Sequence, residues 1–308
     1  MSTDSSEKVY DLLIIGGGPA GLTAAAYAVR KRIETMLISE DLGGKTNYKF
    51  SLPDVETHLI IDGEELVNKF KSQLEYLDFA RHMAKVTKFQ RAGKRFIATT
   101  PDQQFKGKAA IIATGVMPKR LNIPGEEQYL GHGVSYSTVS HAQLFIDMDV
   151  AVVGGGTQAL QAAAELAQVA KKVNVIGLPK RLVASPLGKK IRDSRKAEFF
   201  TDCTVKEIRG NTSPEKVVLT SKGGESEIPV GGLFIELGYI PNTNLFSRLV
   251  KMNREKRIII DENNQTNVAG LFAAGDVTNV NAQQVVIAIG EGANAALSAY
   301  NYLLTLKA

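Results

Sequence analysis

The chain has 308 residues, of which 44% are hydrophobic and 22% charged, a composition typical of a globular α/β protein with room for two domains. Its net charge of +5, with acids and bases mixed along the chain, gives no reason to expect a nucleic-acid partner. The single cysteine, Cys203, excludes an internal disulfide or a cysteine-rich metal site, and we expect it to be a small buried apolar residue. No apolar run is long enough to span a membrane and the polar N-terminus lacks a signal-peptide core, so we expect a cytoplasmic protein without membrane contact.

The first forty residues contain a dinucleotide-binding pattern. Its parts follow in register: an apolar strand over 12–15, Gly16, Gly18 and Gly21 in G-x-G-x-x-G spacing, an alanine-rich helix over 22–30, a strand over 35–39, and Glu40. Gly16 permits a tight turn, Gly18 lets backbone N–H groups approach a pyrophosphate, and Gly21 lets the helix pack on the strand. Glu40 can accept hydrogen bonds from ribose hydroxyls. Together these parts predict a bound dinucleotide.

Turn residues and alternating apolar patterns predict the elements that follow. They are a helix over 63–76, an antiparallel hairpin formed by 84–89 and 95–100, and a buried strand over 109–113 that ends in Thr114 and Gly115. We expect the hairpin to be a small insertion in the larger fold.

A second dinucleotide-type pattern begins near residue 150. It consists of a strand over 150–153, the spacing G-x-G-x-x-A over 154–159, a helix over 160–170 and a strand over 173–176. Further strands are predicted over 204–209, 216–220 and 233–235. Two such units are an internal repeat at domain scale. We therefore predict an α/β fold with two Rossmann-like, three-layer dinucleotide-binding domains, the second inserted in the first.

The C-terminal part is predicted to return to the first domain. Strands are expected over 257–260 and 271–273, Gly275 and Asp276 follow the latter, and a helical stretch over 283–304 is interrupted around 290–292. Ligands of α/β sheets bind at the carboxyl ends of the strands, so Asp276 is a candidate ligand-binding residue.

The order of these motifs resembles that of the low-molecular-weight thioredoxin reductases of the pyridine nucleotide–disulfide oxidoreductase class. The resemblance runs along nearly the whole chain and rests on 16–21, Gly43-Gly44, 113–115, 124–126, 131–136, 154–159, 270–276, and Gln284 with the helix that follows. It implies an FAD-binding domain formed by 1–116 and 245–308, an inserted NAD(P)-binding-like domain formed by 117–244, two short hinges, and a homodimer.

The resemblance also assigns residues to FAD. It implies that Gly16, Gly18 and Ala20 approach the pyrophosphate, Glu40 the adenosine ribose, Thr114 and Gly115 the flavin, Asp276 the ribityl and phosphate side, and Gln284 with Val285 the flavin ring. The full predicted set is Gly16, Gly18, Pro19, Ala20, Gly21, Glu40, Gly43, Gly44, Lys45, Val86, Ala113, Thr114, Gly115, Gly275, Asp276, Gln283, Gln284 and Val285. No metal ligands are predicted.

The sequence departs from the family at its redox-active disulfide. Where the family has a CxxC followed by Asp, this chain has Ser137 and Ser140, followed by His141. A hydroxyl forms no disulfide and gives no thiolate at neutral pH, so dithiol exchange with thioredoxin through this site is excluded. His141 is a candidate general acid or base beside a flavin, and a hydrogen-bonded histidine without a catalytic function is the alternative. We name His141, with Ser137 and Ser140 at the lost CxxC positions, as the candidate catalytic residues.

The inserted domain lacks the basic clamp of NADPH-using relatives. Their His-Arg-Arg stretch is replaced by Gly177, Leu178 and Pro179, and no acid stands there to bind an NAD ribose. The glycine loop therefore indicates a retained fold, and we expect the reaction to be independent of NADPH.

Seven basic residues cluster between positions 180 and 196 of the inserted domain. They are Lys180, Arg181, Lys189, Lys190, Arg192, Arg195 and Lys196. A solvated helix face is the simpler interpretation. The alternative is a docking patch for an acidic electron carrier such as ferredoxin or flavodoxin, for which relatives that take electrons from ferredoxin are a precedent.

The sequence thus favours an FAD-dependent oxidoreductase that exchanges electrons with a redox protein or another acceptor, without a dithiol. An NAD(P)H-dependent flavin or ferredoxin reductase is the second hypothesis. A non-catalytic flavin-binding sensor or partner protein is the third.

Overall fold

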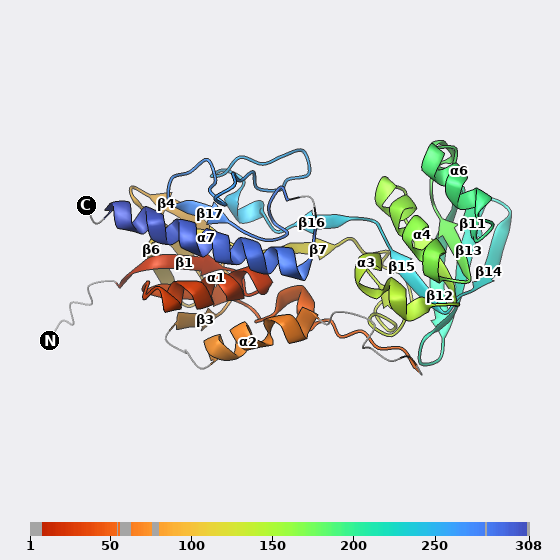
Figure 1. The fold of residues 1–308 in the computed structure, drawn as a ribbon, viewed down its shortest axis with the longest axis horizontal. Helices are drawn as coiled ribbons and strands as arrows, with labels where there is room; N and C mark the ends of the chain where they lie inside the picture. The colour runs from red at the N-terminus through yellow and green to blue at the C-terminus, as the bar shows by residue number, and fades with distance from the viewer. Residues whose placement is uncertain (1–7, 54, 56–62, 76–79, 281, 307–308) are drawn as a thin grey trace. The chain divides into compact units, whose positions relative to one another are not determined.

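The computed structural model describes residues 8–53, 55, 63–75, 80–280 and 282–306 (Figure 1). The chain divides into two compact units. The first unit comprises Met1–Asn47, Asp62–Met117 and Ile240–Ala308, and the second comprises Tyr48–Ile61 and Pro118–Tyr239. The mixed α/β architecture with two parallel sheets confirms the predicted fold class.

The first unit is built on one sheet. Its strands are β1 (Val9–Ile15), β2 (Thr35–Ser39), β3 (Arg81–Met83), β4 (Lys88–Ala92), β5 (Arg95–Thr99), β6 (Gln104–Ile112) and β17 (Leu271–Ala273). They lie in the order β3-β2-β1-β6-β5-β4, and β17 pairs with the end of β6. The hairpin β4–β5 is antiparallel to β6, and the other pairs are parallel.

Three α-helices accompany this sheet. They are α1 (Pro19–Arg30), α2 (Gly63–Glu75) and α7 (Val285–Leu306), together with the 3-10 turns η1 (Gly44–Asn47) and η5 (Asn244–Phe246). Helices α1 and α7 lie side by side in Figure 1. The strands predicted over 12–15, 35–39 and 271–273 are confirmed, because their apolar residues are the buried centre of the sheet. Helix α2 confirms the prediction over 63–75, and residue 76 lies outside the described residues.

The second unit holds a parallel sheet and an antiparallel one. The parallel sheet has the order β11 (Ala197–Phe200), β10 (Lys172–Ile176), β9 (Asp149–Val153), β15 (Gly232–Ile235) and β8 (Val134–Ser135). The antiparallel sheet consists of β12 (Cys203–Gly210), β13 (Pro214–Ser221) and β14 (Gly224–Pro229). The helices are α3 (Thr138–His141), η4 (Ala142–Phe145), α4 (Thr157–Val169), α5 (Lys180–Val183) and α6 (Pro186–Asp193). At the unit boundaries, β7 (Val116–Pro118) pairs with β16 (Tyr239–Pro241).

One stretch groups differently from the predicted division, which placed all of 1–116 in the first domain. The structure groups Tyr48–Ile61 with the second unit. Leu52 is buried in the core of that unit, and the ring of Phe50 stacks on His141 with centroids 4.1 Å apart. These contacts join parts of the chain that are distant in sequence, so no local sequence pattern predicts them.

Two sequence predictions for the C-terminal part are wrong. The stretch 257–260 is not a strand, because only isolated bridges from Ile258 to Met252 and Thr278 form there. Helix α7 is not interrupted at 290–292 but continues through these residues. A Cβ on Gly292 would lie 2.2 Å from the carbonyl oxygen of Ala20, so this glycine allows close packing of α7 on α1. No helix within the described part of the chain is both long and apolar enough to cross a membrane.

Candidate cofactor site

The carboxyl ends of parallel strands of the first unit come together at one edge of the sheet. The backbone N–H groups of Gly16, Ala113 and Ala274, which follow β1, β6 and β17, each donate to a carbonyl of the neighbouring strand at 2.8–2.9 Å. The residues predicted to bind FAD after these strands are therefore neighbours in space, as ligand-binding residues of α/β sheets are.

The first glycine loop is shaped by close backbone contacts. Gly16 has a φ of +110°, and a Cβ there would lie 2.4 Å from the carbonyl oxygen of Ala113. A Cβ on Gly21 would lie 1.8 Å from the carbonyl oxygen of Gly16. Both positions exclude a side chain, which confirms the turn and packing functions expected from the spacing.

Gly18 differs from its neighbours because its missing side chain faces open space. No heavy atom lies within 4 Å of the position of a Cβ there. Gly18 is the N-cap of α1, no side chain caps this helix end, and the first turn contains no acid. The first N–H groups of α1 are thus available to an anion, with the positive end of the helix dipole behind them. This open helix end fits the pyrophosphate of FAD.

A second loop lies against this helix end. Gly43 donates its N–H to the carbonyl oxygen of Gly17 at 2.7 Å, and Gly44, with a φ of +57°, places its Cβ position 3.1 Å from the Cα of Gly18. The residue after them, Lys45, forms an ion pair with Asp276, with 2.5 Å between Nζ and Oδ2. The structure therefore brings together predicted residues from the ends of β1, β2 and β17.

Asp276 is held in place by a residue that sequence analysis did not single out as functional. The guanidinium of Arg257 donates to the backbone carbonyl of Asp276. The side-chain amide oxygen of Gln283 accepts from the same guanidinium. Arg257 is only 7% exposed. Because Arg257 is buried and bonded to carbonyl and amide oxygens, it positions the loop that contains Asp276. Arg257 belongs to no sequence motif, so the sequence gives no signal of this function.

Thr114 and Gly115 are locked by a second residue that the prediction of site residues missed, Asn242. The Thr114 hydroxyl donates to the Asn242 carbonyl at 2.8 Å, and the Asn242 side-chain amide donates to the Thr114 carbonyl at 2.9 Å. The backbone N–H of Asn242 donates to the Gly115 carbonyl at 3.0 Å. Gly115 has a φ of +63° and open space at its Cβ position. The turn predicted to lie near the flavin is therefore rigid and uncovered on one side.

The remaining predicted cofactor residues occupy varied environments. Glu40 is exposed and pairs with Lys85 at 3.5 Å. Val86 packs in the core of the first unit, so its side chain faces other residues rather than solvent. Gln284 precedes α7 and accepts at its carbonyl from Ala288 at 3.0 Å. These FAD assignments stay predictions.

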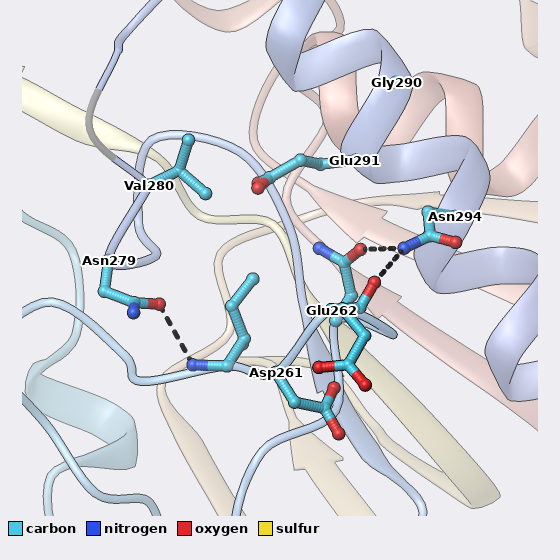
Figure 2. Close-up of a pocket in the computed structure, with 9 residues that line it drawn as sticks. Asp261, Glu262, Asn279, Val280, Gly290, Glu291 and Asn294 are labelled. Atoms are coloured by element: carbon cyan, nitrogen blue, oxygen red, sulfur yellow. Dashed lines mark hydrogen bonds between the residues drawn. The ribbon is translucent and has the colours of Figure 1, made fainter.

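A pocket of about 330 Å³ lies beside α7, and none of the predicted cofactor residues lines it. Its lining consists of Ile260, Asp261, Glu262, Asn264, Asn279, Val280, Gly290, Glu291 and Asn294 (Figure 2). Several of these polar groups hold the loops, as Asn294 does by donating to the Asn264 side chain at 2.7 Å and to the Glu262 carbonyl at 2.8 Å. Glu291 accepts from Gly275 N–H at 2.6 Å, and burial raises its pKa.

The second glycine loop shares two contacts with the first, although Gly154 lacks the positive φ of Gly16. A Cβ on Gly154 would lie 2.4 Å from the carbonyl oxygen of Glu236, and Gly156 caps α4 without a side-chain bond and with open space around it. After β10, however, Leu178 is buried, and the first cation is Lys180, which pairs with Asp202 at 3.0 Å. The loop is therefore preserved without the basic clamp.

Ser137 and Ser140, which the resemblance places at the positions of the family's disulfide, lie together. Their hydroxyl oxygens are 2.8 Å apart at the start of α3. Between them, Thr138 donates its hydroxyl at 2.7 Å and its backbone N–H at 3.2 Å to Glu236 Oε1. Burial raises the pKa of Glu236. The hydroxyls thus stabilise the turn through a hydrogen bond but supply no thiolate.

His141 is partly buried between polar and aromatic neighbours. Its Nδ1 lies 2.7 Å from the Ser135 hydroxyl, and its ring stacks on Phe50. Burial lowers the pKa of His141 to about 4, so the ring is neutral at pH 7. A neutral, stacked imidazole favours the structural interpretation over a proton donor, and the catalytic assignment stays a prediction.

Cys203 is half-buried, and its thiol donates to the Phe200 carbonyl at 3.3 Å. Burial, with a smaller effect of Asp202, raises the pKa of this thiol. Over the ranges that the structure describes, no three His, Cys, Asp or Glu side chains gather as they would around a metal ion.

Comparisons with known proteins agree with this geometry. Residues 10–292 match the family model described as pyridine nucleotide-disulphide oxidoreductase. The F subunit of alkyl hydroperoxide reductase in Staphylococcus aureus (strain MRSA252) is 33% identical over 312 residues, which cover 98% of this chain and 62% of that protein. The chain thus spans about three fifths of the length of the curated relatives it matches.

Solved structures are similar along the whole chain. Thioredoxin reductase from Streptococcus pyogenes MGAS5005 has a TM-score of 0.87 and 35% identity, and the match covers 97% of this chain and 100% of that one. A ferredoxin-flavin thioredoxin reductase from Clostridium acetobutylicum has a TM-score of 0.50 and 30% identity, with 97% and 99% covered. The resemblance noted in the sequence is therefore confirmed: this chain belongs to the pyridine nucleotide-disulphide oxidoreductase family, in the group related to thioredoxin reductases and the F subunit of alkyl hydroperoxide reductase.

Proposed function

We propose that this chain is an FAD-dependent oxidoreductase that exchanges electrons between FAD and a redox protein or another acceptor, with no dithiol step and without NADPH. The observation that carries the proposal is the open N-terminus of α1 at Gly18, beside the ion pair of Lys45 and Asp276. The family typically binds FAD, and the open helix end can accept its pyrophosphate, so both observations support FAD as the cofactor. FAD, when bound, supplies the transfer of two electrons or of one electron at a time.

The chain's own residues would position the cofactor, and they provide no pair of thiols for electron transfer. Gly18 and the first turn of α1 bind phosphate, Asp276 and Glu40 accept from sugar hydroxyls, and Asn242 fixes the turn at Thr114. The hydroxyls of Ser137 and Ser140 cannot accept electrons, so these side chains cannot relay electrons between a bound flavin and a partner.

An acidic carrier protein is the partner that we propose. On α5 and α6, the exposed side chains of Arg181, Lys189 and Lys190, with Arg195 just beyond, form no ion pair or hydrogen bond with any described residue. Exposed cations that are not neutralised by acidic side chains attract an acidic protein. A similar solved structure is named a ferredoxin-flavin thioredoxin reductase, which supports a carrier of this class.

A homodimer is also part of the proposal. Helix α7 exposes Val286, Leu297 and Leu304, at 55%, 37% and 47%, along one side. Such an apolar stripe is typical of a helix that packs against a partner. Sedimentation of the purified protein should give twice the mass of the chain, and a monomer at micromolar concentration would contradict this.

Spectroscopy of the purified protein tests the function. We expect flavin absorption as purified, and bleaching within seconds on anaerobic mixing with reduced ferredoxin or flavodoxin but not with NADPH. A colourless protein that does not take up added FAD would refute the proposal. Stoichiometric FAD that no donor reduces would instead support the non-catalytic flavin-binding alternative.

The second candidate is an NAD(P)H-dependent reductase. The observation that favours it is the preserved loop at Gly154 and Gly156, with the uncapped start of α4. Anaerobic titration with NADH and NADPH distinguishes the two candidates. Rapid bleaching by either nucleotide, with saturation at micromolar concentration, would establish this candidate in place of the first.

A further inference from the structure

The ion pair between Lys45 and Asp276 stands at the centre of the candidate cofactor site. Its Nζ and Oδ2 atoms are 2.5 Å apart, and the side chains are 37% and 11% exposed. Lys45 belongs to the turn η1, and Asp276 follows β17. Both residues come from the loops that surround the open start of α1.

Each partner is fixed by backbone contacts of its own loop. Gly44, just before Lys45, donates its N–H to the Asp41 carboxylate at 2.9 Å, and Gly43 donates to the Gly17 carbonyl at 2.7 Å. On the other side, Arg257 donates to the backbone carbonyl of Asp276. The pair is therefore built into the cradle and is not a chance meeting of two long surface side chains.

The charges around the candidate pyrophosphate site suggest a function for the ion pair of Lys45 and Asp276. Asp276 brings a negative charge to a place where a pyrophosphate, with two more, has to bind. The nearby Glu291, which accepts from Gly275 N–H, is another carboxyl group and cannot offset a negative charge. The Arg257 guanidinium is directed at the Asp276 backbone carbonyl, the Gln283 amide oxygen and the Glu255 carboxylate, 3.4 Å away, rather than at the Asp276 carboxylate. Lys45 is thus the cation that offsets Asp276.

We propose that Lys45 is a specificity-determining residue: by neutralising Asp276 beside the open helix end, it lets the site accept the pyrophosphate of FAD and so favours the dinucleotide over flavins without phosphate. The inference rests on the proposed FAD function and names the residue that selects the cofactor. It predicts a charge effect on FAD binding that riboflavin, which has no phosphate, does not feel.

The experiment measures flavin binding to protein from which the flavin has been removed. Fluorescence quenching gives the Kd for FAD and for riboflavin in wild type and Lys45→Gln. We expect the variant to bind FAD about tenfold more weakly or worse, to bind riboflavin within about threefold of wild type, and to show a shallower salt dependence for FAD. Lys108→Gln is the matched control, because Lys108 pairs with Asp11 at 2.7 Å in the same unit with similar exposures of 45% and 19%.

A double-mutant cycle isolates the proposed cause. In an Asp276→Asn background the further loss caused by Lys45→Gln should shrink to within about threefold, because there is no carboxylate left to neutralise. An equal loss in both backgrounds, an equal loss for riboflavin, or FAD affinity unchanged in Lys45→Gln would each overturn the inference. These outcomes leave the proposed function standing, whereas wild type that takes up no FAD would remove both.

Discussion

The two glycine loops of the molecule make the same close backbone contact but differ in conformation and in surroundings, because Gly16 has a φ of +110° whereas Gly154 has no positive φ. In both, the first glycine of the motif sits against a carbonyl at 2.4 Å from its Cβ position, and in both the helix that follows begins at an uncapped glycine. The first loop is joined by Lys45 and Asp276, whereas the strand end beside the second carries the buried Leu178. The glycines therefore specify the turn, and the residues at the neighbouring strand ends specify whether a charged ligand has partners there.

The largest expected effect is the loss of flavin and stability caused by a side chain in the first loop, compared with the same change in the second loop. Gly21→Val places a side chain where a Cβ already lies 1.8 Å from the Gly16 carbonyl, so we expect protein without flavin and a loss of unfolding free energy of roughly 3 kcal/mol or more. Gly154→Val meets a comparable clash at Glu236 and should destabilise the second unit while flavin absorption persists. Flavin content and urea denaturation measure both. Gly156→Ala, which enters open space, is the control, and loss of flavin in Gly154→Val would break the comparison.

A pH effect is expected from His141 in the second unit. Burial lowers the pKa of His141 from 6.5 to about 4, so between these values the unfolded chain binds a proton that the folded chain does not. Stability from this residue is complete above pH 6.5 and is lost as the pH falls, by about 2 kcal/mol between pH 7 and pH 5. Denaturant titrations of wild type and His141→Gln at both pH values measure the difference. An identical pH dependence in the two proteins would contradict the neutral, buried state of His141.

A smaller effect is expected at the turn beside the first loop. Asn242→Ala removes the hydrogen bond to the Thr114 carbonyl, and the loosened turn should weaken FAD binding about tenfold. Asn294→Ala, which changes the pocket beside α7, should leave the Kd for FAD within about threefold of wild type. If both variants weaken FAD binding equally, the effect is not specific to the turn, and the pocket beside α7 also contributes to cofactor binding.

The smallest effect concerns the surface of the second unit. Neutralising Lys189, Lys190 and Arg195 with glutamine should slow reduction by an acidic carrier about threefold to tenfold at low salt, with the difference vanishing at high salt. Lys206, Arg209 and Lys216 form the matched control, because each is already paired with glutamates on β12 to β14. Stopped-flow mixing measures the rates, and an equal slowing by both sets would argue against a docking surface.

Local patterns explain how far the sequence could be interpreted. The strand over 12–15 was predictable because a short apolar run indicates a buried strand. The turn after it was predictable because the spacing of the glycines indicates that turn. Contacts between distant parts were not. Asn242 reaches Thr114 across 128 positions, and Gly292 looked like a helix break although its bare Cα serves a neighbouring helix. The grouping of Phe50 with the second unit likewise depends on tertiary packing, which overrides local preference.

Ser137 and Ser140 present hydrogen-bonded hydroxyls rather than thiols, and this has a consequence for the chemical durability of the protein. The chain's one thiol, on Cys203, is half-buried and has a raised pKa, so peroxides and alkylating reagents meet little thiolate on this protein. A dithiol reductase is poisoned by such reagents at its own centre. We therefore expect the proposed electron transfer to persist after treatment with iodoacetamide.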